Sequence, residues 1–491
     1  MSDTQLKKGR LGVLGIVFFV VAASAPLVGM TGAVPVAIAA GNGAAAVGTY
    51  LAVGLVLLIF SVGYTAMSSR VTNTGAFFAY VGRGLGTNAG VASAFTSIVA
   101  YVTIQLAIYG FFGGLVAGEM AARFSIDLPW FVWAIVAWLI VTGLSLLSVD
   151  VGAKVLGVLL VLELLALMIT AIAIFANPKN AGVDLMASFS PEQIFAGGFA
   201  GGAGIAIAFA FASFIGFEAT AIYGEESKNP KRDVPRATYW AVGTITLLFT
   251  FVSLAMVTGL GASSVQMKVA MLAGADLANP AAVLFHLAEV NVGAWMPEVM
   301  GLLVISSLFA GLLAFQNAAS RYFFALGRGG VLPTRFGTTN KYGAPAVGVV
   351  LTSVLALLVM IGFAIAGLDG ISQLFFWMSA VAVIAIIFVE ILVSIAVVAY
   401  FTKEGGENIW RSKIAPIVSA VALAIGLYLL MSRFNLLSFL APSPERAGNA
   451  WDLSPLGWVL VLTPFIAALV GYIVAVVNKK ENASLVKDIL S

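Results

Sequence analysis

The chain has 491 residues, of which 61% are hydrophobic and 10% are charged, and its formal net charge is +3. Soluble domains contain about 25% charged residues, so a water-soluble fold of this size is excluded and the lipid bilayer must act as the solvent. Cysteine is absent and there is a single histidine, which excludes disulfides, cysteine chemistry and a histidine cluster for zinc. We expect an all-α integral membrane protein without a metal or a cofactor.

Twelve stretches of the chain are long and apolar enough to span a membrane, which takes about 20 largely apolar residues. They are, approximately, 12–41, 46–69, 89–122, 130–149, 153–176, 197–226, 237–260, 296–327, 346–367, 371–401, 413–432 and 456–477. An even number of spans puts both termini on one side of the membrane. We expect residues 1–491 to form a single transmembrane domain, with no soluble domain attached.

The basic residues indicate which side holds the termini. With the amino terminus in the cytoplasm, 20 of the 25 Lys and Arg residues lie in cytoplasmic segments. The remaining five are Arg123, Lys179, Lys268, Arg433 and Arg446. This asymmetry follows the positive-inside rule. It predicts a multi-pass protein of the cell membrane with both termini in the cytoplasm.

Two of the predicted spans are interrupted by helix-breaking residues. The first span contains Pro26, Gly29, Gly32 and Pro35, and each proline removes a backbone donor and clashes with the preceding turn. The sixth span breaks at residues 214–216, which include a glycine. Non-helical backbone at this depth survives only where it is buried in protein or faces a water-filled cavity.

The two interrupted spans lie five spans apart, so the two halves of the chain have opposite orientations. This arrangement is typical of an inverted-topology repeat. We expect repeats at about 12–176 and 197–401, followed by extra helices at about 413–432 and 456–477. One proline-kinked helix would also suit a channel or a scaffold. Two breaks at matching places favour a transporter.

The two breaks predict a site with two electrostatic poles. A half-helix that begins inside the membrane presents free amides, which attract an anion. In the first span we expect these amides to belong to Gly29, Met30, Thr31 and Gly32. Carbonyl groups that end the first half-helices, near 23–25 and near Phe214 and Ile215, attract a cation. A zwitterion such as an α-amino acid would suit such a site.

Several sequence strings resemble one transporter family. The string Phe214-Ile215-Gly216-Phe217-Glu218, followed by the charged segment 226–236, resembles the signature of the amino acid–polyamine–organocation permeases. Supporting matches are Ser320-Arg321, which leads through 330–333 to Pro345, and the segment 74–80. The resemblance covers essentially the whole chain. It implies the LeuT-type fold, with twelve transmembrane helices in a 5+5 inverted repeat whose helices 1 and 6 are broken. The first span departs from the common family pattern.

The resemblance also implies which residues meet the substrate. The family holds its substrate between spans 1 and 6, walled by spans 3, 8 and 10. Besides the residues of 29–32, the implied substrate-binding residues are Ala212, Phe214, Ile215, Gly216, Phe315 and Trp377. In span 3, Tyr101, Gln105 and Tyr109 recur every four residues and share one helix face. That face either lines the cavity or makes interhelical hydrogen bonds.

Charged residues inside the spans are candidates for coupling and gating, because an unpaired charge at mid-bilayer costs about 2.5–3.5 kcal/mol. By resemblance, Lys154 replaces a sodium ion and bridges span 1 to span 8 near Ser306 or Ser307; alternatively, it only snorkels to the cytoplasmic surface. Glu218 either carries a proton or fixes spans 6 and 7 by hydrogen bonds. Two further carboxylates within the spans, Glu163 and Glu390, match no motif, and we interpret them as mainly structural.

The leading hypothesis is a secondary active transporter that imports an amino acid or a related amine by alternating access. We expect it to be sodium-independent and proton-coupled, with an amino acid/polyamine exchanger as the alternative. A channel or an intramembrane enzyme fits less well, and no phosphate-binding loop indicates primary active transport. The expected partners are the small-molecule substrate, protons and the bilayer, without nucleic acid. Neutral amino acids, cationic amino acids and polyamines all remain as substrates.

Overall fold

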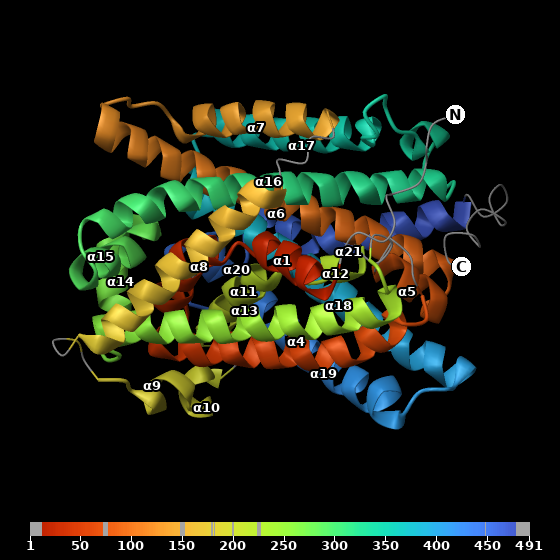
Figure 1. The fold of residues 1–491 in the computed structure, drawn as a ribbon, viewed down its shortest axis with the longest axis horizontal. Helices are drawn as coiled ribbons and strands as arrows, with labels where there is room; N and C mark the ends of the chain where they lie inside the picture. Colours follow the sequence, from red (N-terminus) through yellow and green to blue (C-terminus); the bar gives the residue numbers. More distant parts are fainter. Residues whose placement is uncertain are drawn as a thin grey trace.

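The computed structural model describes residues 12–71, 77–147, 153–177, 180, 182–198, 201–222, 227–446 and 448–477. These residues form helices and, within the described ranges, no strand. This is the expected outcome for a chain that must satisfy its backbone hydrogen bonds inside lipid. Figure 1 shows the long helices lying side by side in one bundle.

The first predicted span is divided into short helical pieces, whereas each of the next four predicted spans is a single helix. The pieces are α1 (Val13–Ala23), α2 (Pro26–Val28), the π-helical turn η1 (Gly29–Ala33), α3 (Val34–Val36), η2 (Ala37–Asn42) and η3 (Gly43–Ala45). After them come α4 (Ala46–Ser68), α5 (Phe77–Leu85), α6 (Thr87–Phe124), α7 (Trp130–Leu146), α8 (Ala153–Ala176), α9 (Leu185–Phe189) and α10 (Pro191–Ile194).

The rest of the chain begins with the second interrupted span, formed by α11 (Ala203–Phe214) and α12 (Ala219–Ile222). The later helices are α13 (Pro230–Leu260), α14 (Val265–Ala273), α15 (Ala281–Asn291), α16 (Trp295–Arg328) and α17 (Ala346–Ile365). They continue with the π-helical turn η8 (Gly370–Phe375), α18 (Phe376–Glu404), η9 (Trp410–Ile414), α19 (Ala415–Ser432), α20 (Phe434–Ser438) and α21 (Pro455–Val477).

Among the described residues, ten helical stretches are long and apolar enough to cross a membrane. One of them, Val13–Ser68, has 56 residues and covers the first two predicted spans. A further predicted span corresponds to α7, which is shorter, with 17 residues. The all-α membrane class predicted from composition is therefore confirmed.

The two interrupted spans run antiparallel and cross at their breaks. The first piece of span 1, α1, contacts α12, which is the second piece of span 6. Conversely, α11 contacts η1, α3 and η2, which follow the break in span 1. Helix α6 packs against α16, α18 and α21, and α4 packs along α13, as can be followed in Figure 1. The breaks consequently lie inside the bundle.

Candidate functional site

The break in span 1 lies at Ser24 and Ala25. Helix α1 ends at Ala23, and Ala25 adopts a left-handed conformation with φ of +43°. The helix restarts at Pro26, where the fixed φ of proline suits the first helical position and its missing N–H costs no hydrogen bond. The restart therefore comes three residues before the predicted one at Gly29.

This earlier restart corrects the expected role of residues 29–32. The N–H of Gly29 donates a backbone hydrogen bond to the carbonyl of Ala25 at 3.1 Å, so it is not a free helix-start amide. Met30 and Gly32 are buried in η1. The Thr31 hydroxyl donates to the carbonyl of Leu27 at 2.8 Å, which turns it towards its own helix. The amides without an intrahelical acceptor belong instead to the residues directly after Pro26.

The break in span 6 falls where the sequence predicted it. Helix α11 ends at Phe214, Ile215 leaves the helical region with φ of −55° and ψ of 129°, and the chain resumes a helix at Ala219. Between them Gly216 has φ of +113°, a conformation that residues with a Cβ rarely adopt. The partly buried Ala212 lies in the last turn, where its carbonyl accepts the N–H of Ile215 at 3.3 Å.

The two breaks touch each other through glycines. A Cβ atom built on Gly216 would lie 3.1 Å from the Cβ of Ala23. A Cβ on Gly29 would lie 2.5 Å from Cε1 of Phe249 and 3.4 Å from Oγ of Ser213. The backbone of span 6 therefore approaches Ala23 closely at Gly216, and side chains of α13 and α11 approach the backbone of span 1 closely at Gly29; glycine permits both approaches.

Aromatic side chains close this place from the other helices. Phe111 of α6 stacks on Phe375 of η8 with ring centres 5.0 Å apart, and Phe209 of α11 lies 6.1 Å from Phe375. A Cβ on Gly32 would lie 3.0 Å from Phe111 and 3.3 Å from Phe375. These phenylalanines were not predicted from the sequence. The chain has 34 phenylalanines, and only packing distinguishes those of the wall from the others.

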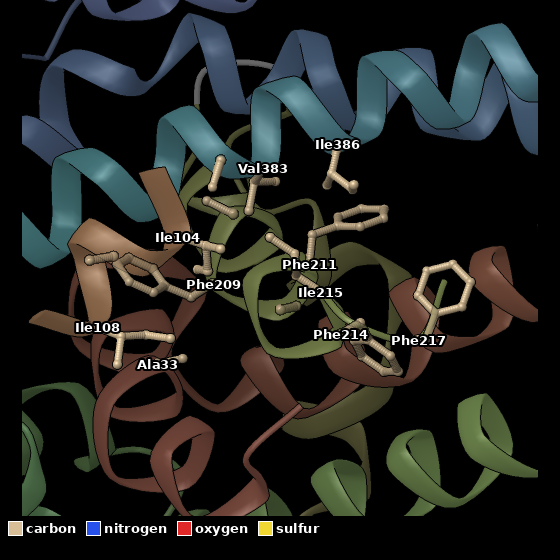
Figure 2. Packing of buried hydrophobic residues seen from close by; sticks show 14 of the residues in the cluster. Ala33, Ile104, Ile108, Phe209, Phe211, Phe214, Ile215, Phe217, Val383 and Ile386 are labelled. Atoms are coloured by element: carbon tan, nitrogen blue, oxygen red, sulfur yellow. The ribbon is translucent and has the colours of Figure 1, made fainter. Parts of the chain in front are cut away.

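Aliphatic side chains continue the same wall. Figure 2 shows the side chain of Phe209 beside those of Ile104 and Ile108, with Ala33 close by. Ile104 and Ile108 come from α6 and are 5% and 7% exposed. These are apolar groups, so the part of the wall seen in Figure 2 offers dispersion contacts and no charge.

Trp377 does not line the place where the breaks meet. Its indole N–H donates to the carbonyl of Ser438 at 2.8 Å, and its ring packs edge-on against Phe363 at 5.5 Å. The wall residue from this span is Phe375 instead. A π-helical turn, here η8, contains an extra residue, which rotates the following side chains relative to an ideal α-helix. A substrate contact of Trp377 stays a prediction, whereas Phe375 is the residue of this span that packs against Gly32.

The span 3 face contains residues with different environments. The amide N–H of Gln105 donates to Oε1 of Gln316 at 2.6 Å, and Gln316 in turn donates to Ser353 of α17. Gln105 therefore makes interhelical hydrogen bonds, which was one of the two predicted alternatives. Tyr101 lies one turn earlier and faces the broken sixth span. Phe315 of α16 stacks on Tyr101 with ring centres 6.2 Å apart.

Glu218 is completely buried and caps the break in span 6. Its carboxylate accepts a hydrogen bond from the hydroxyl of Tyr101 at 2.9 Å and another from the backbone N–H of Gly216 at 2.8 Å. The hydroxyl of Tyr64 donates to the backbone carbonyl of Glu218 at 2.7 Å. The break is thus held by hydrogen-bond donors from α4, from α6 and from its own loop. None of these three donors is a basic side chain.

Glu163 plays an equivalent part at the break in span 1, although the sequence analysis rated it as structural. Its carboxylate accepts a hydrogen bond from the hydroxyl of Ser307 at 3.0 Å and another from the backbone N–H of Leu27. Ser306 instead donates to the carbonyl of Leu303 in its own helix. The side chain of Lys154, predicted to bridge to these serines, lies outside the described residues.

A family model for amino acid permeases matches residues 15–484. The chain belongs to the amino acid permease family. This agrees with the resemblance carried by the sixth-span string and places the chain with transporters rather than enzymes.

Curated relatives of this family member are distant in sequence. It is 22% identical over 356 residues to the branched-chain amino acid permease BcaP of Bacillus subtilis, covering 72% of this chain and 64% of the relative. It is 29% identical over 209 residues to BcaP of Lactococcus lactis, covering 42% and 41%. It is 23% identical over 363 residues to the probable amino-acid permease meu22 of Schizosaccharomyces pombe, covering 72% and 60%. The chain thus spans less than two thirds of the length of each.

Proposed function

We propose that this chain is a secondary active transporter that imports an apolar amino acid across the cell membrane by alternating access. The observation that carries the proposal is the crossing of two interrupted helices at their breaks, where Gly216 packs on Ala23. Broken helices that cross inside a bundle bring half-helix ends of both signs to one point. Such a point suits the ammonium and carboxylate groups of an amino acid.

We further propose the LeuT-type architecture of twelve helices in two inverted repeats of five. The antiparallel crossing of the two broken spans supports it. With both termini in the cytoplasm, α1 and α12 form the inner halves of the broken spans and α11 the outer half of the sixth. The contact between α1 and α12 agrees with this assignment.

The proposed substrate has an apolar side chain such as that of leucine, isoleucine or valine. Ile104, Ile108 and Phe209 support this choice because they would surround a substrate side chain with aliphatic and aromatic groups. A cationic side chain would need a free carboxylate, and the two carboxylates at the breaks, Glu218 and Glu163, already accept hydrogen bonds from the protein. Two of the relatives also bear the name branched-chain amino acid permease.

The proposed coupling is to protons through Glu218, without sodium. A carboxylate with no basic partner inside a bundle can take up and release one proton. Independence from sodium rests on the resemblance at Lys154, whose ammonium would replace the ion. The substrate is expected to bind beside residues 29–32, which pack against the crossing, and at the backbone of 214–216, with Phe315 and Tyr101 forming the neighbouring wall.

An uptake panel in proteoliposomes tests this function. We expect leucine, isoleucine and valine to accumulate when the outside is made more acidic, and the accumulation to be unchanged when sodium is replaced by potassium. Lysine and putrescine should not compete. Accumulation that requires sodium, or competition by putrescine equal to that by leucine, would contradict the proposal. Preloaded leucine should also drive counterflow, which a channel does not support.

A further inference from the structure

Glu163 joins three helices through one carboxylate. It lies in α8 and is 3% exposed. Its first donor, the hydroxyl of Ser307, comes from α16 at 3.0 Å. Its second donor is the backbone N–H of Leu27, directly after the proline that restarts span 1. The carboxylate is therefore the point at which the broken span is tied to two unbroken helices.

The ionised form of Glu163 fits these donors. The amide of Leu27 belongs to the first turn of a half-helix, where no intrahelical acceptor exists and the helix dipole favours a negative charge. An ionised carboxylate only accepts hydrogen bonds, and both of its partners donate. No local sequence pattern indicates this contact, because Ser307 is 144 residues away along the chain.

Charged groups on the neighbouring helices lie far from this point. Helix α8 packs against α1, α2, α13, α15 and α16, and the described parts of α1 and α2 contain no titratable side chain. The titratable residues of α13, α15 and α16 are Lys231, Arg232, Asp233, Arg236, Tyr239, His286, Glu289, Glu298, Arg321, Tyr322 and Arg328. The five titratable residues of α13 all lie in the first three turns of that helix. In α16, Ser307 is more than two turns from Glu298 and almost four turns from Arg321. His286 lies at the far end of α8, near Asn180.

Protonation changes what this carboxyl group can do. A proton from water adds to one carboxylate oxygen, and no other bond is made or broken. The resulting hydroxyl is a donor that needs an acceptor. The Ser307 hydroxyl can rotate to accept it, and the remaining carbonyl oxygen can still accept the Leu27 N–H, but as a neutral acceptor, whose hydrogen bonds are about half as strong as those of a carboxylate. Protonation therefore weakens the tie to α2 and leaves the break in span 1 less firmly held.

We propose that Glu163 is a proton-binding latch. When ionised, it ties the start of α2 to α8 and α16 and keeps the break in span 1 closed; proton uptake loosens this tie. This assigns to Glu163 the holding role that the sequence predicted for Lys154. Its relevance to transport rests on the proposed function, whereas the latch itself is a property of the fold and can be tested separately.

The lack of cysteine in the chain makes a labelling experiment clean. A cysteine placed at Ala22, in the last turn of α1, reports access to the break. The full chain in lipid nanodiscs would be labelled with a water-soluble maleimide at about pH 5.5 and about pH 8.5. Rates are divided by those of Thr402→Cys, an exposed position, to remove the intrinsic pH dependence of the thiol. We expect the corrected rate at Ala22→Cys to be about tenfold higher in acid, as expected when one charged hydrogen bond becomes neutral.

Two substitutions then identify the group responsible. Glu163→Gln, which cannot ionise, should label rapidly at both pH values. Ser307→Ala, which removes one donor, should label faster than the parent in alkali. Ser306→Ala is the matched control and should behave as the parent does, because its hydroxyl bonds within its own helix. If Glu163→Gln does not fold, as judged by size-exclusion chromatography, Ser307→Ala and Ser306→Ala decide the matter.

Unchanged, pH-dependent labelling in Glu163→Gln would overturn the latch, as would equal effects of Ser306→Ala and Ser307→Ala. Leucine counterflow measured on the parent separates this inference from the proposed function. Labelling as expected without leucine counterflow would leave the latch standing and reject the transport proposal. Normal counterflow with pH-independent labelling would reject the latch alone.

Discussion

Replacing Gly216 by alanine is expected to abolish leucine uptake and to lower the stability of the folded chain. Its φ of +113° is one that an alanine adopts only under strain, at a cost of about 1–3 kcal/mol. The added methyl group would also lie 3.1 Å from the Cβ of Ala23, so the two breaks would be pushed apart. Because the substrate is proposed to bind at this crossing, uptake should fall more than about tenfold.

The measurement pairs uptake in proteoliposomes with thermal unfolding followed by tryptophan fluorescence. Gly243→Ala is the matched control, since Gly243 lies in the interior of α13 and a Cβ there would meet nothing within 4 Å. Alanine is the better helix former at such a position, so this variant should keep uptake and stability. Wild-type uptake in Gly216→Ala would show that the close crossing of the breaks is not needed.

Replacing Glu218 by glutamine is expected to remove the dependence of leucine accumulation on the proton gradient. Glutamine keeps an acceptor for the Tyr101 hydroxyl and the Gly216 N–H, but it cannot bind or release a proton. Counterflow should continue, while accumulation driven by an acid outside should fall to its level without a gradient. Accumulation should fall because leucine import in this variant would no longer carry protons inwards.

Tyr101→Phe serves as the companion variant. It removes the hydroxyl that donates to Glu218 but retains the ring that stacks on Phe315. We expect it to alter the pH profile of uptake without abolishing it. Glu218→Gln transport that keeps the pH dependence of the parent would exclude Glu218 as the proton carrier. The carboxylate would then have only its structural role at the break.

The parts of the site that local sequence controls were predicted well. Gly216 belongs to a short string of residues that together indicate the end of a helix, and the structure has the break of span 6 at this string. In span 1 the end of the first half-helix near 23–25 was predicted correctly, and only the restart was placed three residues late, since Pro26 was weighed as a kink and not as a helix start. Both outcomes depend only on residues adjacent in the chain.

The parts that depend on long-range packing were not predictable in the same way. Trp377 was preferred over Phe375 because the extra residue of a π-helical turn is invisible in a hydrophobic pattern. Glu163 looked like an isolated charge, since its partners Leu27 and Ser307 belong to distant segments. Charges that match no motif acquire a role only when the fold brings their donors to them.

Direct binding of radiolabelled leucine to the purified chain is the measurement that tests the central claim, that the crossing of the two breaks holds an apolar amino acid. We expect saturable binding that valine and isoleucine displace and lysine does not. Gly32→Val should abolish it, because even a Cβ there would lie 3.0 Å from Phe111. Full binding in a folded Gly32→Val variant, or no saturable leucine binding to the unmodified chain, would contradict the account.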